Sequence, residues 1–177
     1  MDTYKNKIAL VTGASTGIGR AMAIDLAAQG AELILTARSK EKLDALAQEI
    51  QGKGGMAHVF VEDLAQPGSG ERLHQQVLAA GLHVDVLINN AGYGRWGQFE
   101  EFQRDDYAAM IQLNITSLTD LCHLFMPAMV NKGVGGVINI GSSASFLPVP
   151  YATVYSSTKA YVLMLSEALR YEYAQKN

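Results

Sequence analysis

Tyr155 and Lys159 are four residues apart, within the segment Tyr-Ser-Ser-Thr-Lys. If this segment is helical, the two side chains share one face, which places an ammonium group beside a phenol. An ammonium favours the ionised form of a neighbouring phenol, so the pair suits proton transfer near neutral pH. Ser142 lies thirteen positions before the tyrosine, after an apolar run, and supplies a hydroxyl. Together the three groups suit proton transfer to a carbonyl oxygen.

A glycine-rich segment near the start of the chain has the features of a phosphate-binding turn. Thr12 and Gly13 follow an apolar stretch, and Gly17 and Gly19 open a segment with helical character. Small residues let the backbone approach a pyrophosphate, and the N–H groups of a helix N-terminus attract anions. The spacing Gly-x-x-x-Gly-x-Gly differs from the general Gly-x-Gly-x-x-Gly fingerprint. A tight connection between a strand and a helix is the alternative interpretation.

Two positions after later apolar runs bear on which nucleotide would bind. A carboxylate after the second strand typically binds the ribose 2′-hydroxyl of NAD, but this chain has Arg38 there. A guanidinium can bind a 2′-phosphate, which favours NADP(H); a solvated surface arginine is the alternative. Asp63 follows the third run, where its carboxylate can accept a hydrogen bond from an adenine amino group or begin a turn.

Apolar runs alternate with helical patterns along the chain, which is typical of βαβ units and a parallel sheet. We expect strands at 7–12, 31–37, 56–61, 84–88 and 136–140. We expect helices at 17–30, 40–51, 70–80, 105–131 and 151–175. Right-handed crossovers then give a Rossmann-type α/β fold, a doubly wound parallel sheet in a three-layer α/β/α arrangement, with strand order 3-2-1-4-5. Ligands of such sheets bind at the carboxyl ends of the strands.

The last two expected helices are apolar on more than one face. Residues 162–165 form a complete apolar turn, and residues 124–126 are apolar in the preceding helix. One face is expected to pack on the sheet, so the other needs a second cover. We therefore expect a homodimer or homotetramer formed through these helices; burial under irregular segments is the alternative. Pro127 is expected to kink its helix or to end the regular part.

The composition predicts one globular domain, residues 1–177. The chain has 49% hydrophobic and 18% charged residues, a net charge of −3 and a single cysteine. These values favour a core-forming protein of a reducing compartment. We expect no nucleic-acid partner, because no basic patch is evident, and no membrane span, because no apolar run approaches about 18 residues. Without a signal-peptide pattern or metal-ligand spacing among the histidines, we expect a cytoplasmic protein that binds no metal.

Taken together and in order, these motifs resemble the short-chain dehydrogenase/reductase family in its compact one-domain form. The resemblance covers almost the whole chain and includes the segment Asn89-Asn-Ala-Gly92. It implies a catalytic set of Ser142, Tyr155, Lys159 and Asn114. It also implies a cofactor site made of Gly13, Ser15, Thr16, Gly17, Ile18, Gly19, Arg38, Asp63, Leu64, Asn90, Ala91, Gly92, Tyr155 and Lys159.

The resemblance implies hydride transfer between a nicotinamide cofactor and a secondary alcohol or ketone, with 3-oxoacyl-type substrates among the candidates. Tyr155 would exchange the proton, Lys159 would also hold the nicotinamide ribose, Ser142 would bind the substrate oxygen, and Asn114 would hold a relay water. Arg38 resembles the pattern of NADP-preferring members. Thr16 stands where some of those carry a basic residue, so NAD(H) remains an alternative.

The chain also departs from the family. Family members normally continue past the tyrosine helix with a sixth strand, a Pro-Gly cofactor turn, a substrate loop and a seventh strand, whereas this sequence stops at Asn177. We therefore expect a sheet that lacks its last strands, with its fifth strand as an exposed edge. The alternative function is a noncatalytic nucleotide-binding or oligomer-forming remnant or fragment. Tyr93, Arg95 and Trp96 either line a substrate mouth or cover a loop.

Overall fold

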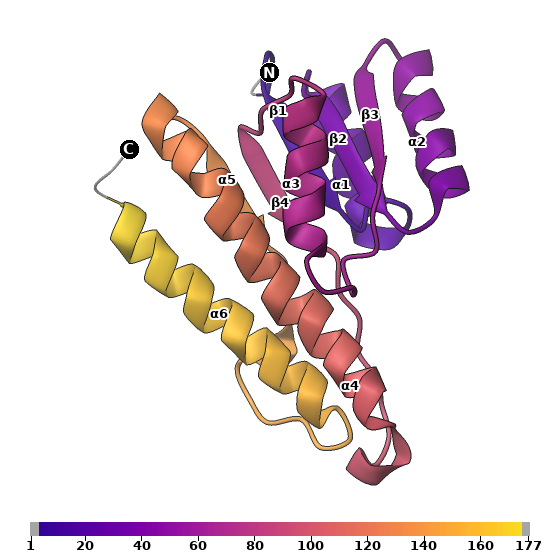
Figure 1. The fold of residues 1–177 in the computed structure, drawn as a ribbon, viewed down its shortest axis with the longest axis vertical. Helices are drawn as coiled ribbons and strands as arrows, with labels where there is room; N and C mark the ends of the chain where they lie inside the picture. The colour runs from indigo at the N-terminus through magenta and orange to yellow at the C-terminus, as the bar shows by residue number, and fades with distance from the viewer. Residues whose placement is uncertain (1–3, 175–177) are drawn as a thin grey trace.

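The computed structural model describes residues 4–174 and shows a five-stranded parallel sheet with helices on both faces (Figure 1). The strands are β1 Ile8–Thr12, β2 Glu32–Ala37, β3 Met56–Val61, β4 Val86–Asn89 and β5 Gly136–Asn139. The helices are α1 Gly17–Ala28, α2 Lys40–Gly52, α3 Ser69–Ala79, α4 Arg104–Ile111, α5 Leu118–Lys132 and α6 Thr153–Tyr173. The strand order is β3-β2-β1-β4-β5. The predicted Rossmann-type fold and strand order are confirmed.

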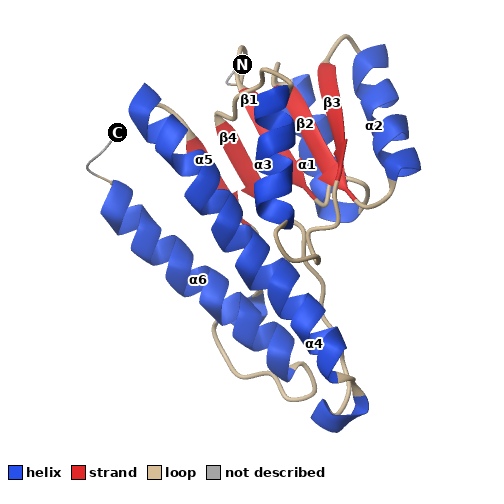
Figure 2. Ribbon diagram, viewed as in Figure 1, coloured by secondary structure: helices blue, strands red, loops and turns tan. Residues whose placement is uncertain are grey.

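Alternation along the buried strands divides the interior into two cores, one on each face of the sheet. Ile8 and Leu10 of β1 point into the core beneath α3, α5 and α6. Ala9 and Val11 of the same strand point into the core beneath α1 and α2. Figure 2 shows this separation, with the strands between the two sets of helices. The three predicted layers therefore follow from residues buried on both sides of β1.

Most expected boundaries differ from the observed ones by one or two residues. The helix expected at 17–30 ends at Ala28, and Gly30 follows in a left-handed conformation with φ of 89°. The N–H of Gly30 donates to Ala27 O at 3.0 Å, which satisfies a carbonyl of the last turn. The expected end of the last helix at residue 175 lies outside the described residues.

The single regular helix expected at 105–131 is wrong. α4 and α5 are joined by a six-residue π-helical segment, Gln112–Ser117, so the helix runs on with a widened turn in its middle. Pro127 does not end the helix, because α5 continues to Lys132. The interruption lies about three turns earlier, in a segment that carries the buried Asn114.

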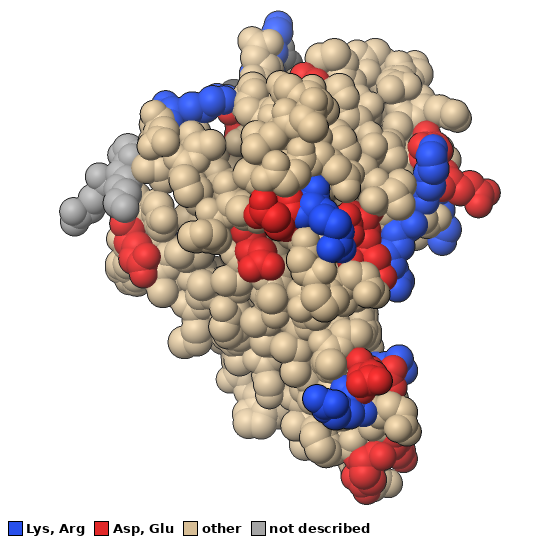
Figure 3. Space-filling model, in the orientation of Figure 1, with Lys and Arg blue, Asp and Glu red and all other residues tan. Residues whose placement is uncertain are grey.

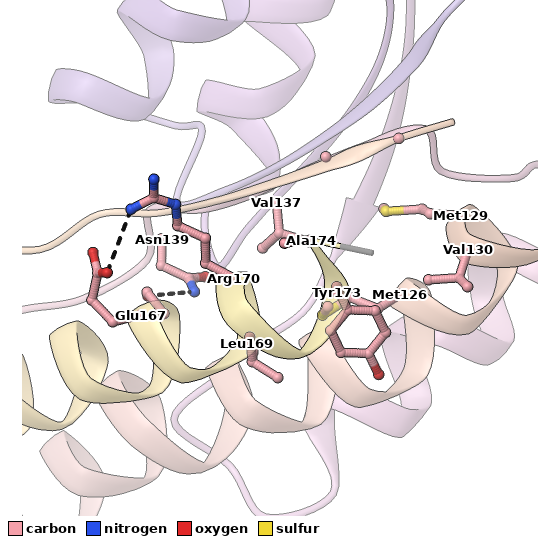
Figure 4. A pocket seen from close by; sticks show the side chains of 13 residues that line it. Met126, Met129, Val130, Val137, Asn139, Glu167, Leu169, Arg170, Tyr173 and Ala174 are labelled. Atoms are coloured by element: carbon pink, nitrogen blue, oxygen red, sulfur yellow. Dashed lines mark hydrogen bonds and ion pairs between the residues drawn. The ribbon is translucent and has the colours of Figure 1, made fainter. Parts of the chain in front are cut away.

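β5 is the edge of the described sheet and borders a groove between α5 and α6 (Figure 4). The groove has a volume of about 460 Å³. Val137 of β5, Met129 of α5 and Tyr173 of α6 line it, and Asn139 Nδ2 donates to Ser166 Oγ at 2.9 Å within it. None of the residues predicted for the catalytic or cofactor site lies in this groove.

Among the described residues, no helix has the length and apolar character that crossing a bilayer requires.

Candidate active site

A cavity of about 860 Å³ lies at the carboxyl ends of the strands. Its walls come from the glycine turn after β1, the segments after β2 and β3, the Asn-Asn-Ala-Gly segment after β4, and Ile140 and Gly141 after β5. α6 contributes Tyr155 and Lys159. Almost all predicted cofactor residues line this one cavity, namely Gly13, Ser15, Thr16, Gly17, Ile18, Arg38, Asp63, Leu64, Asn90, Ala91, Gly92, Tyr155 and Lys159.

Gly19 is the predicted cofactor residue that does not line the cavity; instead it allows close packing behind the glycine turn. A Cβ atom on Gly19 would lie 2.4 Å from Asn90 Nδ2 and 2.5 Å from Gly13 O. Asn90 Nδ2 in turn donates to Thr12 O at 2.9 Å and to Gly13 O at 3.3 Å. The side chain of Asn90 therefore ties the end of β4 to the turn after β1, and the small size of Gly19 permits it.

The N-terminus of α1 faces the cavity with the character of an anion site. Thr16 precedes the helix and makes no side-chain capping bond, and the first turn of α1 contains no acidic residue. Its backbone N–H groups are thus left for a ligand, and the helix dipole favours a negative one. Gly17 adopts φ of 57°, a conformation that glycine takes at little cost.

The end of the cavity near β2 and β3 contains opposite charges. Arg38 is exposed and makes no hydrogen bond or ion pair with another described residue, so its guanidinium is available to a ligand. Asp63 accepts from Ala65 N at 3.1 Å and from Gln66 Nε2 at 3.4 Å, so it forms a turn and also lines the cavity. Lys42, near the start of α2, lies in the same wall.

Tyr155 and Lys159 lie together on α6 at the other end of the cavity. Lys159 Nζ is 6.0 Å from the centroid of the Tyr155 ring. The lysine is 6% exposed, and its Nζ donates to Ile140 O at 2.7 Å. Burial lowers the pKa of Lys159 below its ordinary value. The spacing of four residues thus places a desolvated cation beside the phenol, as the sequence predicts.

Asn114 is buried behind the cavity wall and does not line it. Its Oδ1 accepts from Tyr93 N at 3.2 Å, and its Nδ2 donates to Tyr93 O at 2.9 Å and to Thr158 Oγ1 at 3.0 Å. A Cβ atom on Gly92 would lie 3.1 Å from Asn114 Oδ1 and 3.6 Å from Lys159 Nζ, so these two atoms approach the same point of the loop.

Ser142 also lies outside the cavity lining, next to Gly141, which lines it. Its Oγ accepts from Ala144 N at 3.1 Å and thereby caps a short helical turn, Ser143–Ser145. The structure therefore places Ser142 beside the cavity with its hydroxyl engaged in a local turn.

Several lining residues were missed by reasoning from the sequence, among them Lys42, Glu62 and Gly94. Lys42 had a signal, because it is a second basic residue shortly after Arg38, near the start of the expected helix. Gly94 had none, since its closeness to Tyr155 arises from chain segments some sixty residues apart. Tyr93 lines the cavity, whereas Arg95 and Trp96 are exposed outside it.

A protein-family model for short chain dehydrogenase matches residues 7–177 of the chain. The chain belongs to the short-chain dehydrogenase family. Within it, this chain is 35% identical over 176 residues to human very-long-chain 3-oxoacyl-CoA reductase, a match that covers 95% of this chain and 55% of the relative. The chain spans about half the length of the curated relatives it matches.

Solved structures of the family agree closely with the structure of this chain. A metagenomic short-chain oxidoreductase in complex with NADP has a TM-score of 0.92 and 36% identity, over 98% of this chain and 79% of that one. A short-chain dehydrogenase from Sphingobium yanoikuyae in complex with NADPH has a TM-score of 0.90 and 35% identity, over 96% of this chain and 67% of that one.

Proposed function

We propose that this short-chain dehydrogenase is an NADP(H)-dependent oxidoreductase that interconverts a ketone and a secondary alcohol. One observation carries the proposal: a single cavity connects the uncapped N-terminus of α1 with Tyr155 and Lys159. The first is a site for the phosphates of a dinucleotide, and the second supplies an acid and a cation beside it. The structural neighbours named above were crystallised with NADP or NADPH, which supports the choice of cofactor.

The residues present fit a bound dinucleotide phosphate. The glycine turn and the N–H groups of α1 would hold the pyrophosphate, and Arg38 with Lys42 would bind a 2′-phosphate. The Asp63 side chain and the backbone at Leu64 would contact the adenine, while Asn90, Ala91 and Gly92 would flank the nicotinamide side. Lys159 would hold the nicotinamide ribose.

When bound, NADPH supplies the hydride that adds to the carbonyl carbon of a ketone. The hydroxyl of Tyr155 donates its proton to the carbonyl oxygen, which gives the secondary alcohol and leaves a phenolate. The ammonium of Lys159 stabilises that phenolate by its charge. A proton from solvent would then restore the hydroxyl, through a water held near Gly92, the residue that Asn114 Oδ1 and Lys159 Nζ both approach. During proton transfer from Tyr155 to the substrate, the Ser142 hydroxyl would exchange its hydrogen bond with Ala144 N for one to the substrate oxygen.

For the substrate we propose ketones that include 3-oxoacyl thioesters. The name of the human relative, a very-long-chain 3-oxoacyl-CoA reductase, supports this class. The 3-oxo group of such a substrate is a ketone, so its reduction to a secondary alcohol needs the same acid as the reduction of any other ketone.

The test begins with calorimetric titration of the purified chain with NADPH and then with NADH. We expect NADPH to bind more tightly, and we expect NADPH absorbance to fall when a 3-oxoacyl thioester or a simple ketone is added. Tyr155→Phe should bind NADPH within about twofold of wild type and lose about 10²–10⁴-fold in kcat, the range of general acid catalysis.

Three results would count against this function. Absence of binding of either cofactor would overturn the dinucleotide site. Binding without turnover of any ketone or alcohol would overturn the oxidoreductase activity and leave a nucleotide-binding protein. Retained activity in Tyr155→Phe would remove the tyrosine from the proton-transfer step.

We also propose that two copies of the chain associate through α5 and α6. Tyr161 and Met164 of α6 are exposed, Met164 to 65%. Figure 3 shows few charged side chains over much of the surface that these two helices form. Apolar surface of this kind is typical of subunit contacts.

A further inference from the structure

The loop after β4 passes directly over the ring of Tyr155, and Gly94 is the residue at the point of contact. A Cβ atom on Gly94 would lie 2.8 Å from Tyr155 Cγ, 2.8 Å from its Cδ2 and 3.3 Å from its Cβ. Favourable contacts between carbon atoms are about 3.5–4.0 Å, so a methyl group at this position would collide with the ring. Only a residue without a side chain lets the backbone lie this close.

We propose that Gly94 is a positioning residue that holds the phenol of Tyr155 in place in the cavity. The inference rests on the proposed function, because it concerns the proton donor of the same site. Gly94 and Tyr155 both line the cavity, and Gly94 covers the ring with backbone atoms. The phenol is thus held between this loop and the helix from which it projects.

The loop that carries Gly94 is anchored on both sides and cannot easily withdraw from the ring. Before Gly94, the carboxamide of Asn114 binds both the N–H and the C=O of Tyr93, at 3.2 and 2.9 Å. After Gly94, Gly97 N donates to Tyr151 O at 2.9 Å. Since Asn114 is buried, moving the loop would break hydrogen bonds that water cannot readily replace.

A larger residue at position 94 would therefore displace the tyrosine. The backbone of Tyr155 is fixed in α6, where Thr158 Oγ1 donates to Tyr155 O at 2.7 Å. The atoms in conflict are Cγ and Cδ2, which lie at the root of the side chain, so a small tilt of the ring cannot relieve the contact. Relief requires rotation about χ1 toward another staggered position, and that rotation carries the phenolic oxygen away from its present place.

The experiment compares wild type, Gly94→Ala and Gly52→Ala. A Cβ atom on Gly52, at the end of α2, would meet no atom within 4 Å, so this variant controls for the loss of a glycine. Nuclear magnetic resonance of protein with labelled tyrosine rings should show, in wild type and Gly52→Ala, a cross-relaxation contact between the Gly94 Hα and the Tyr155 ring. In Gly94→Ala the Tyr155 ring resonances should shift.

Kinetic measurements distinguish a misplaced tyrosine from a general loss of folded structure. Gly94→Ala should keep the Kd for NADPH and the KM for a ketone within about threefold while kcat falls about 10–100-fold, since small misplacements of a reacting group cost rates of this size. The same change in a Tyr155→Phe background should cause no further loss of kcat, because the group that Gly94 positions is already gone.

The inference is overturned if the wild-type protein shows no contact between Gly94 and the Tyr155 ring. It is also overturned if Gly94→Ala keeps wild-type kcat, or if its Tm and its NADPH affinity fall together with kcat, as a general loss of structure would cause. If the wild-type chain itself shows no turnover, the proposed activity fails, and the two resonance measurements still decide whether Gly94 positions the ring.

Discussion

Lys159 is a buried cation with one of its three hydrogen-bond donors already used. Nζ donates to Ile140 O at 2.7 Å, and two donors remain for ligands in the cavity. The pKa of this lysine lies below its ordinary value because burial disfavours the charged form. An incoming anionic or hydroxyl-bearing ligand would therefore find a poorly solvated ammonium, which strengthens its interaction with that ligand.

Arg38 is expected to determine the preference between the two nicotinamide cofactors. Arg38→Gln removes the charge that would bind a 2′-phosphate, and hydrogen bonds to charged groups contribute about 1.5–3 kcal/mol. The Kd for NADPH, measured by calorimetry, should rise about 10–100-fold, while the Kd for NADH should change by less than about twofold.

Arg104→Gln is the matched control, because Arg104 is also an exposed arginine but lies in α4, outside the cavity lining. It should leave both constants unchanged. An equal weakening of NADPH and NADH binding in Arg38→Gln would show that the guanidinium does not recognise the 2′-phosphate.

The sequence could predict cavity-lining residues where their placement depends on local spacing. The glycine turn and the Tyr155–Lys159 pair depend on neighbours along the chain, and both line the cavity. The surroundings of Asn114 and Ser142 could not be predicted, because their hydrogen bonds depend on the exact path of two loops. The contact of Gly94 with Tyr155 likewise exists only once β4 and α6 have come together.

At the scale of elements, α5 contains a proline that the surrounding packing tolerates. Pro127 is exposed, lacks a backbone N–H and crowds the carbonyl four residues before it. Pro127→Ala should therefore raise the free energy of unfolding by about 1–2 kcal/mol in urea, after allowance for the more flexible unfolded chain.

The neighbouring Ala128→Gly provides a control of opposite sign. Ala128 is exposed in the same helix, so the glycine should lower the free energy of unfolding by about 1 kcal/mol. A lower stability of Pro127→Ala would indicate that the proline ring makes a packing contribution larger than its cost to the helix.

Asp85, immediately before β4, joins several elements at the end of the sheet opposite the cavity. It is 4% exposed, its Oδ2 accepts from Ile8 N at 3.0 Å, and Lys132 and His83 lie within 3.4 Å and 3.2 Å of its carboxylate. Asp85→Ala leaves the Ile8 N–H without its acceptor and should cost about 2–4 kcal/mol of unfolding free energy.

The same carboxylate gives the stability a pH dependence. Burial alone would raise the pKa of Asp85, but the Ile8 N–H and the charges of His83 and Lys132 outweigh it and hold the pKa below its ordinary value. The contribution of ionised Asp85 to the free energy of unfolding is therefore fully present above the unfolded-state pKa of about 3.9. It is lost as the pH falls through the lower pKa of the folded state.

Urea unfolding of wild type and Asp85→Ala should accordingly differ more at about pH 5 than below about pH 4. Asp44→Ala, which removes an exposed pair with Lys40, should stay within about 0.5 kcal/mol of wild type. A difference between wild type and Asp85→Ala that does not shrink in acid would show that the charge of Asp85 is not its source.

On the scale of the whole molecule, the layered fold was predictable because β1 and β2 are buried on both sides. Continuous apolar runs of this kind occur only in sheets covered twice, and the alternating helices provide the two covers. The π-helical segment within the long helix was not predictable, because its apolar pattern is compatible with a regular helix. The exposed apolar residues of α5 and α6 could be anticipated, because the sequence has more apolar residues in these helices than one buried face requires.

The proposed subunit contact predicts the behaviour of one charged substitution. Met164→Glu places a carboxylate on the exposed face of α6 and should raise the dissociation constant of the dimer at least about tenfold in sedimentation equilibrium, because burying an unpaired charge is costly. Met56→Glu, at a 58% exposed position of β3, should leave it unchanged. A wild-type protein that is monomeric at all concentrations would contradict the proposal.

The pairing of β1 with β4 has a consequence for the order in which the sheet assembles. β1 pairs with β2 at positions 24 residues apart, Ile8 with Glu32, whereas Ala9 pairs with Val86, 77 residues later. Closing the longer loop costs more chain entropy, so the β1–β2–β3 half can form while β4 is still unpaired. Asn90, whose side chain closes the glycine turn, arrives with β4. The phosphate-binding turn would therefore gain its final shape late in folding, after the strand that leads into it.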